Sequence, residues 1–223
     1  MRVLLFGATG MVGQGVLREC LLDPDVELIQ TVGRTPSGTQ HAKLREVVHA
    51  DLWNYSSIET ALAGFDACFF CLGVSSSGMT EPDYERLTYG IAVAAGETLA
   101  RLNPQMTFVY VSGAGTDSSE RGKVMWARVK GKTENALLRL PFKAAYMFRP
   151  GVIQPLHGAT SKTASYRILY SLTKPLLPVL RWTFPGYVLT TEQIGRAMLA
   201  VARHGAPKRV LESKDISLIG RQK

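Results

Sequence analysis

Three glycines near the N-terminus have the spacing and the neighbours that a diphosphate-binding turn requires. In the stretch FGATGMVGQG, Gly7, Gly10 and Gly13 follow an apolar run and open a predicted helix. One glycine permits the sharp turn, one lets the backbone approach a pyrophosphate, and one lets helix and strand pack closely. The free amides and the dipole of the helix N-terminus favour the negative charge. The alternative is an ordinary glycine-rich turn. The predicted contacts in this turn are Gly7, Thr9, Gly10, Met11, Val12 and Gly13.

The residues after the second predicted strand select between two dinucleotides. NAD-binding proteins commonly place an acid about 20 residues beyond the glycines, where it holds the ribose hydroxyls. Here the strand ends TVGRTPSG, so that Gly33 occupies the place of the acid and Arg34 follows it. A guanidinium can grip the 2′-phosphate of NADP through charge and paired hydrogen bonds. The pattern therefore favours NADP over NAD as cofactor, the alternative being that Arg34 is a solvated surface residue.

Apolar runs typical of buried strands alternate with helical segments along the chain. This alternation predicts a Rossmann-type, doubly wound α/β fold, with a parallel sheet of six or seven strands and a small C-terminal cap. Gly15 is expected to be a small residue packed against the sheet. Capping pairs at Ser56/Glu59 and Thr190/Gln193 mark two helix starts. The predicted strands span 2–6, 26–33, 44–51, 66–73, 106–113 and 143–151. The predicted helices span 14–22, 56–62, 82–102, 123–140 and 190–203.

Length and composition indicate one globular domain. The chain has 223 residues, of which 46% are hydrophobic and 20% charged, which suits one sizeable core and is short for two. We therefore expect a single NAD(P)-binding domain over 1–223, with 151–187 as an irregular region that caps the substrate. The net charge of +8 favours anionic ligands. The basic residues are dispersed and no recognition motif occurs, so that nucleic acid is not an expected partner.

The cysteines indicate a reducing compartment. Cys20, Cys68 and Cys71 are too few and too apolar in context to form a disulfide framework. Cys68 and Cys71 lie three residues apart in one predicted strand and should point to opposite faces, as core thiols rather than a redox pair. No secretory signal and no run of 18 apolar residues occurs. These features predict a cytoplasmic protein, and no metal site is expected.

Six motifs in order give the chain a resemblance to a known family. They are GATGMVG, HADL, FFCLG, VYVSGAG, a W-x-x-x-K segment that ends at Lys130, and FRPG. Together they resemble the atypical short-chain dehydrogenase/reductases of the NAD(P)-binding, epimerase-like superfamily. Within these, the chain is similar to the group of the Tat-interacting oxidoreductase-like tumour suppressor. The resemblance implies an NADP(H)-binding oxidoreductase that acts on a small carbonyl substrate.

The same resemblance implies cofactor contacts beyond the glycine turn. The acid after the third strand would recognise the adenine ring, the loop after the fourth strand would pass the ribose, and a lysine would hold the nicotinamide ribose. For Asp51 the alternative is a residue that only forms a turn. The implied contacts are Asp51 and Leu52 at the adenine, Leu72, Gly73 and Val74 at the ribose, Lys130 at the nicotinamide ribose, and Pro150, Gly151 and Val152 beside the nicotinamide.

The catalytic part of the resemblance is altered. In enzymes of this kind a tyrosine four residues before the lysine delivers a proton to a carbonyl, and a serine after the fifth strand polarises that carbonyl. Trp126 occupies the tyrosine position, and an indole N–H donates hydrogen bonds without titrating usefully. Ser112 is present, but Gly113 stands where related proteins often have another serine, with Thr116 in the same loop. We assign Lys130, Ser112 and Trp126 to the catalytic positions and do not expect Trp126 to act as an acid.

Sugar-nucleotide epimerisation is the third-ranked function, because the chain lacks room for a large substrate domain. Two interpretations of the altered site remain open. In the first, the acid is relocated to the region 151–187. In the other, the protein binds NADP(H) and acts as a regulatory or interaction protein with little or no turnover. The basic, aromatic stretch 161–187 would form a lid over an apolar substrate, contact a second copy in a homo-oligomer, or touch a membrane surface peripherally. The candidates for a relocated acid are Tyr166, Tyr170, Tyr187 and His157.

Overall fold

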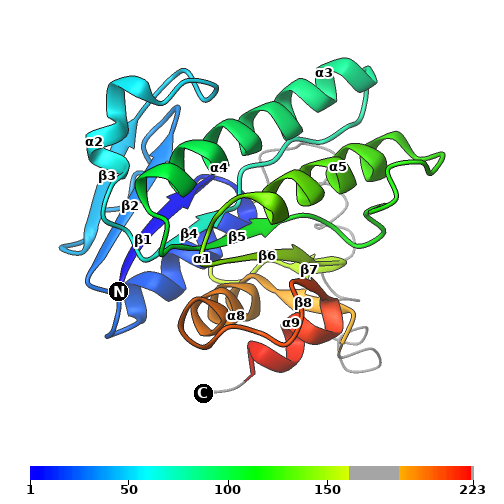
Figure 1. Cartoon of the computed structure of the whole chain (residues 1–223). Helices are drawn as coiled ribbons and strands as arrows, with labels where there is room; N and C mark the ends of the chain where they lie inside the picture. Colours follow the sequence, from blue (N-terminus) through cyan, green and yellow to red (C-terminus); the bar gives the residue numbers. More distant parts are fainter. Residues whose placement is uncertain (161–185, 222–223) are drawn as a thin grey trace.

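A seven-stranded parallel sheet forms the centre of the protein in a computed structural model, which describes residues 1–160 and 186–221 (Figure 1). The strand order is β3-β2-β1-β4-β5-β6-β9, and every neighbouring pair is parallel. The order reverses between β1 and β4, as in doubly wound sheets. The predicted Rossmann-type sheet is therefore confirmed. The strands are β1 (Arg2–Phe6), β2 (Leu28–Gly33), β3 (Leu44–Val48), β4 (Ala67–Phe70), β5 (Thr107–Val111), β6 (Ala144–Arg149) and β9 (Val210–Glu212).

Helices cover both faces of the sheet, because successive strand residues point to opposite sides. In β1, Val3 and Leu5 pack in one hydrophobic cluster, whereas Leu4 and Phe6 pack in the other, and all four are fully buried. Helices α1 (Met11–Leu22), α8 (Thr191–His204) and α9 (Ser213–Ile219) complete the first cluster. Helices α2 (Glu59–Leu62), α4 (Ile91–Leu102) and α5 (Met125–Arg139) complete the second.

A second, two-stranded parallel sheet follows β6. Strand β7 (Val152–Gln154) pairs with β8 (Val188–Thr190), and α8 begins directly after β8. The capping box predicted for α8 is present, since Thr190 accepts from the Gln193 amide and the Gln193 side chain accepts from the Thr190 amide. Most of the region that we expected to cap a substrate lies in 161–185, outside the described residues.

Two predicted helices differ from those observed. The segment 82–102 is divided into α3 (Glu81–Glu85), a π-helical turn η2 (Arg86–Gly90) and α4. Single π-turns of this kind are rare, and composition gives no signal for them. The predicted cap at Ser56 is absent, because the Ser56 amide donates to the Asn54 side chain at 3.0 Å and so forms a turn. A 3₁₀ turn, η1 (Ser56–Ile58), occupies that position before α2.

Gly15 packs against a helix and not against the sheet, which corrects our expectation. A Cβ atom on Gly15 would lie 2.5 Å from the Cβ of Thr191 at the start of α8. Gly195 in α8 leaves similar space for the Glu19 side chain of α1. Because these small residues face the partner helix, α1 and α8 approach closely on one side of the sheet.

The cysteines are buried or half-buried free thiols. Cys68 packs in the cluster under α4, whereas Cys71 packs against the cluster under α1, so that the two point to opposite faces as predicted. Burial raises the pKa of both thiols well above the usual value. This agrees with structural thiols rather than a redox pair. Within 1–160 and 186–221, no helix is long and apolar enough to cross a bilayer.

Candidate functional site

The carboxyl ends of β1, β4, β5 and β6 surround a cleft of about 420 Å³. Ligands of open parallel sheets bind at this edge, where the strand order reverses. The cleft brings together most of the residues singled out in the sequence, from loops that are far apart along the chain. Those that line it are Gly7, Thr9, Gly10, Met11, Val12, Arg34, Leu72, Gly73, Val74, Ser112, Lys130, Pro150 and Gly151.

The glycine turn borders this cleft, and two of its glycines, Gly7 and Gly13, have a steric reason. Gly7 has φ +78°, and a Cβ atom there would lie 2.6 Å from the Leu72 amide nitrogen. Gly13 lies beneath the turn, where a Cβ atom would come within 2.0 Å of the Gly7 carbonyl oxygen. Gly10 is the N-cap of α1, and no side chain caps this helix start. The first turn of α1 therefore offers main-chain amides to an anion.

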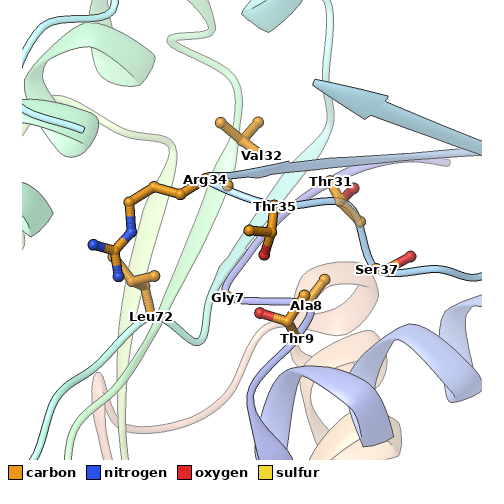
Figure 2. A pocket seen from close by; sticks show the side chains of 10 residues that line it. Gly7, Ala8, Thr9, Thr31, Val32, Arg34, Thr35, Ser37 and Leu72 are labelled. Atoms are coloured by element: carbon orange, nitrogen blue, oxygen red, sulfur yellow. The ribbon is translucent and has the colours of Figure 1, made fainter. Parts of the chain in front are cut away.

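A second pocket of about 340 Å³ adjoins the cleft beside the loop after β2 (Figure 2). The side chain of Arg34 reaches towards Leu72, and Thr35 and Ser37 follow Arg34 in the same loop. The guanidinium and the hydroxyls of Thr35 and Ser37 are donors suited to a phosphate. The pocket is lined by Gly7, Ala8, Thr9, Thr31, Val32, Gly33, Arg34, Thr35, Ser37 and Leu72.

Glu46 holds this loop in place and was missed by the sequence analysis. Its Oε1 atom accepts from the Ser37 amide at 2.7 Å and lies 3.4 Å from the Thr31 hydroxyl. Glu46 is opposite Thr31 in the pairing of β2 with β3, and this register brings the carboxylate to the loop. The sequence could not show this contact, because the alternation of residues along β3 does not reveal which residue of β2 lies opposite Glu46.

Four of the predicted cofactor contacts lie outside the lining of the cleft. Asp51 accepts a hydrogen bond from the Trp53 amide at 3.0 Å and lines an open pocket beside Trp53 and Arg86. Leu52 is buried in the core under α4. Val152 is exposed, and its neighbour Ile153 lines the cleft in its place. The fourth is Gly13, whose role is the close packing described above.

Lys130 enters the cleft from α5 on the side of Ser112. Its Nζ atom lies 5.5 Å from the centroid of the Tyr110 ring, in a cation–π contact. Burial lowers the pKa of Lys130 to about 8, and the Glu134 carboxylate opposes this shift. Ser112 is buried, and its Oγ atom is 3.0 Å from the Thr116 hydroxyl, which donates to the Gly113 carbonyl.

Trp126 does not line the cleft, and its indole ring packs on the loop after β5. A Cβ atom on Gly113 would lie 4.0 Å from the ring, and one on Gly115 would lie 3.6 Å from it. Trp126 thus lies beside the position of the missing serine, although a Cβ atom at 113 or 115 would make only an ordinary van der Waals contact with its ring. This contact replaces the pair of polar groups that the resemblance implies.

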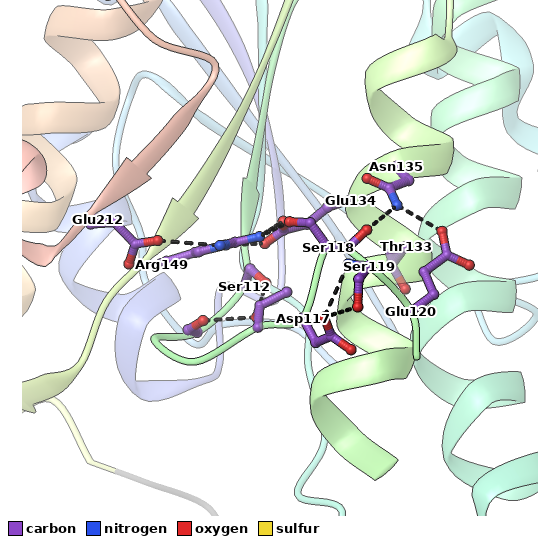
Figure 3. Close-up of polar contacts among 12 residues, drawn as sticks. Ser112, Asp117, Ser118, Ser119, Glu120, Thr133, Glu134, Asn135, Arg149 and Glu212 are labelled. Carbon is purple, nitrogen blue, oxygen red and sulfur yellow. Dashed lines mark hydrogen bonds and ion pairs between the residues drawn. The ribbon is translucent and has the colours of Figure 1, made fainter. Parts of the chain in front are cut away.

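A buried ion pair anchors the C-terminal half of α5 to β6 (Figure 3). The guanidinium of Arg149 donates to both Glu134 carboxylate oxygens, at 3.0 and 2.5 Å, and both side chains are almost completely buried. Arg149 also donates to Ser118 and, at 3.2 Å, to the exposed Glu212. Glu134 lies one helical turn beyond Lys130, so that this pair fixes the helix that carries the lysine.

Comparison with known proteins identifies the family. A family model described as NAD(P)H-binding matches residues 7–139, which span the glycine turn, Ser112 and Lys130. The chain belongs to the NAD(P)H-binding family. Protein FMP52-2, mitochondrial, of Scheffersomyces stipitis is 30% identical over 152 residues, which cover 67% of this chain and 65% of that protein. Protein fmp-52, mitochondrial, of Neurospora crassa is 28% identical over 240 residues, covering 98% and 94% of the two chains.

Solved structures confirm the fold of this NAD(P)H-binding protein. The Bordetella bronchiseptica enzyme WbmF in complex with NAD⁺ has a TM-score of 0.69 at 14% identity, covering 97% of this chain and 76% of that one. The short-chain dehydrogenase/reductase YIR035C of Saccharomyces cerevisiae has a TM-score of 0.60 at 14% identity, covering 96% of each chain. The fold is thus that of short-chain dehydrogenases and epimerase-like enzymes, as the resemblance implied, whereas the narrower Tat-interacting group stays a prediction.

The names of the relatives contradict one expectation. Curated proteins similar to this chain are named mitochondrial, which does not support the cytoplasmic location inferred from the thiols and the lack of a signal. The physical reason is that reduced thiols indicate the redox state of a compartment and do not identify which compartment it is. The expectation of a cytoplasmic protein is withdrawn.

The described candidates for a relocated acid lie away from the NAD(P)H-binding cleft. His157 pairs with Glu192 at 2.8 Å, and hydrogen bonding from His157 lowers the pKa of Glu192. Tyr187 is exposed, with the Lys214 ammonium 5.1 Å from its ring centroid. Neither residue lines the cleft. Tyr166 and Tyr170 lie outside the described residues.

The pKa of Lys130 predicts how NADPH binding depends on pH. With a pKa of about 8, the ammonium form falls from about nine tenths at pH 7 to about one tenth at pH 9. The cofactor is anionic, so we expect its affinity to fall about 3- to 10-fold over this range in calorimetric titrations. Lys130→Met should bind more weakly at pH 7 and lose most of this pH dependence. An unchanged slope in the variant would show that another group is responsible.

Proposed function

We propose that the protein is an NADP(H)-dependent oxidoreductase that reduces a small, partly apolar carbonyl compound. The observation that carries the proposal is the meeting of the glycine turn, Ser112 and Lys130 in one cleft. The turn suits a diphosphate, because Gly7 and Gly13 have no room for side chains and the start of α1 has no side-chain cap. Apolar side chains in the lining of the cleft, including Val74, Val111 and Ile153, suit an apolar substrate.

The pocket beside Arg34 supports NADP(H) over NAD(H). It combines a guanidinium with the hydroxyls of Thr35 and Ser37, and the acid that commonly holds the ribose in NAD-binding proteins is replaced by Gly33. When bound, the cofactor would supply hydride chemistry, while the chain would hold its phosphates and orient its nicotinamide. The residues present therefore suit a phosphorylated dinucleotide.

Replacing Arg34 with alanine tests the proposed cofactor. We expect NADPH affinity to fall roughly 10- to 100-fold, because hydrogen bonds to charged groups contribute about 1.5–3 kcal/mol. NADH affinity should change less than about threefold, since NADH lacks the 2′-phosphate. Arg45→Ala is the control, because Arg45 is exposed on β3 and lines neither pocket. Equal losses for the two cofactors in isothermal titration calorimetry would contradict the preference for NADP.

A second candidate function is an NADP(H)-binding regulatory or interaction protein with little or no turnover. The observation that favours it is the placement of Trp126, whose ring contacts the loop 113–115 and not the cleft. Among the residues that the structure describes, no tyrosine or histidine lines the cleft.

NADPH oxidation separates the two candidates. 9,10-Phenanthrenequinone and 4-nitrobenzaldehyde are suitable probes, measured with the unchanged protein and with Trp126→Tyr. Reduction by the unchanged protein supports the oxidoreductase. Tight NADPH binding without reduction supports the regulatory protein, and reduction only by the tyrosine variant would show a site that has lost its acid.

A further inference from the structure

Reduction of a carbonyl, the reaction proposed above, needs a proton on the carbonyl oxygen, and the cleft holds few groups that can give one. Burial raises the pKa of the Cys71 thiol, and a guanidinium such as that of Arg34 does not deprotonate near neutral pH. The hydroxyls of Ser75 and Ser112 are very weak acids. Of the cleft residues that the structure describes, the ammonium of Lys130 is the group able to release a proton near neutral pH.

The surroundings of Lys130 leave its ammonium free to face the cleft. The nearest carboxylate on its own helix, Glu134, is held at both oxygens by Arg149 of β6. From β5, Tyr110 presents its ring to the Nζ atom, and burial raises the pKa of its hydroxyl. Within 1–160 and 186–221, no carboxylate lies within ion-pair distance of Nζ. An ammonium without a carboxylate partner keeps its donors for a ligand.

We propose that Lys130 itself donates the proton that the missing tyrosine would supply. This assignment rests on the proposed reductase function. In the step, one Nζ–H bond of Lys130 breaks and the proton joins the carbonyl oxygen, while bound NADPH would supply the hydride that bonds to the carbonyl carbon. The products are the alcohol, the oxidised nicotinamide and a neutral Lys130 amine. Water then returns a proton to the amine for the next turnover.

The acid strength of Lys130 suits this role. General acids act best when their pKa lies near the working pH, and burial brings that of Lys130 to about 8. Phosphates bound in the cleft would raise this pKa, because negative charge favours the ammonium. The rate of reduction should therefore decrease with rising pH, with its midpoint at or above 8. In the usual arrangement the lysine only assists a tyrosine, whereas here Trp126 turns to the loop 113–115.

Two substitutions of Lys130 separate proton donation from charge. Lys130→Arg keeps a cation that does not give up its proton, so NADPH binding should stay within about tenfold while reduction of 9,10-phenanthrenequinone falls about 10²- to 10⁴-fold. Lys130→Met should lose reduction similarly and bind NADPH more weakly. Lys132→Met is the matched control, because Lys132 lies on the same helix but pairs with Glu85 outside the cleft. Its activity should stay unchanged.

A measurement without turnover tests the same assignment. Trace acetylation of the protein with acetic anhydride, mapped by peptide mass spectrometry, follows deprotonation of each amine across pH. Lys130 should become reactive with a midpoint near 8, whereas Lys132, whose pKa is raised by its hydrogen bond to Glu85, should become reactive only at a clearly higher pH. Titration of Lys130 together with Lys132 would overturn the assignment.

The outcomes distinguish this assignment from the function on which it rests. Reduction that persists in Lys130→Arg would overturn proton donation by Lys130 and leave the reductase function intact. Absence of NADPH-dependent reduction of either probe by the unchanged protein would overturn the reductase function and, with it, this assignment. Loss of reduction in Lys130→Arg with NADPH binding preserved, together with the early titration of Lys130, would support both.

Discussion

Replacing Glu134 with alanine should lower the free energy of unfolding by about 3–5 kcal/mol. The substitution leaves the Arg149 guanidinium buried without the carboxylate that accepts two of its hydrogen bonds. Removing one partner of a buried pair is costly because the remaining charge cannot return to water. Denaturation in urea, followed by circular dichroism, measures the change.

Glu212→Ala is the matched control for this pair. Glu212 accepts from the same guanidinium at 3.2 Å, but its side chain is 51% exposed. An exposed ion pair contributes about 0–1 kcal/mol, and Glu212 also stands at the N-cap of α9, so this variant should lose clearly less stability than Glu134→Ala. Equal destabilisation by the two substitutions would show that burial does not decide the strength of the network in Figure 3.

Replacing Gly13 with alanine should abolish measurable NADPH binding, with a loss greater than about 100-fold. The added Cβ atom would lie 2.0 Å from the Gly7 carbonyl oxygen, so the turn and the start of α1 must separate. The separation moves the helix amides away from the diphosphate that they would contact. Gly113→Ala is the control, because Gly113 lines neither pocket and a Cβ atom there would make only an ordinary contact, 4.0 Å from the Trp126 ring.

A second substitution keeps this prediction testable if Gly13→Ala fails to fold. Met11 is the first residue of α1, where proline is tolerated, and Gly10 before it is extended at φ −84°, ψ 162°. Met11→Pro removes one amide donor and should weaken NADPH binding roughly 10- to 100-fold with the fold retained. Met11→Ala keeps the amide and controls for the side chain. Unchanged affinity in Met11→Pro would contradict diphosphate binding by these amides.

The glycine turn could be predicted from the sequence because its signal is local. Strand, turn and helix are contiguous, and Gly13 answers a steric requirement within this stretch, whereas the space that Gly7 needs is limited by the distant Cys71 and Leu72. The doubly wound parallel sheet was also predicted, from the alternation of buried strands with helices, although its strand order was not. Lys130 and Ser112 were predicted as site residues from the resemblance that the six motifs carry. The structure places both in the lining of the cleft.

Features that depend on tertiary pairing could not be predicted. A glutamate in mid-helix is usually exposed, and nothing in the sequence shows that Glu134 meets Arg149 in the core. Glu46 reaches the loop after β2 only through the register of two strands. Gly15 was expected to pack against the sheet, because the sequence does not show that α8 lies against this part of α1.

The contact between Trp126 and the loop 113–115 has a consequence for any attempt to install the tyrosine. A phenol ring is smaller than an indole, so Trp126→Tyr alone leaves a void over Gly115 and lets the new side chain settle in several rotamers. Serine at position 113 would refill part of that space and offer a hydroxyl. The two positions should therefore be energetically coupled, and a double-mutant cycle would give a non-additive gain that neither exchange delivers by itself.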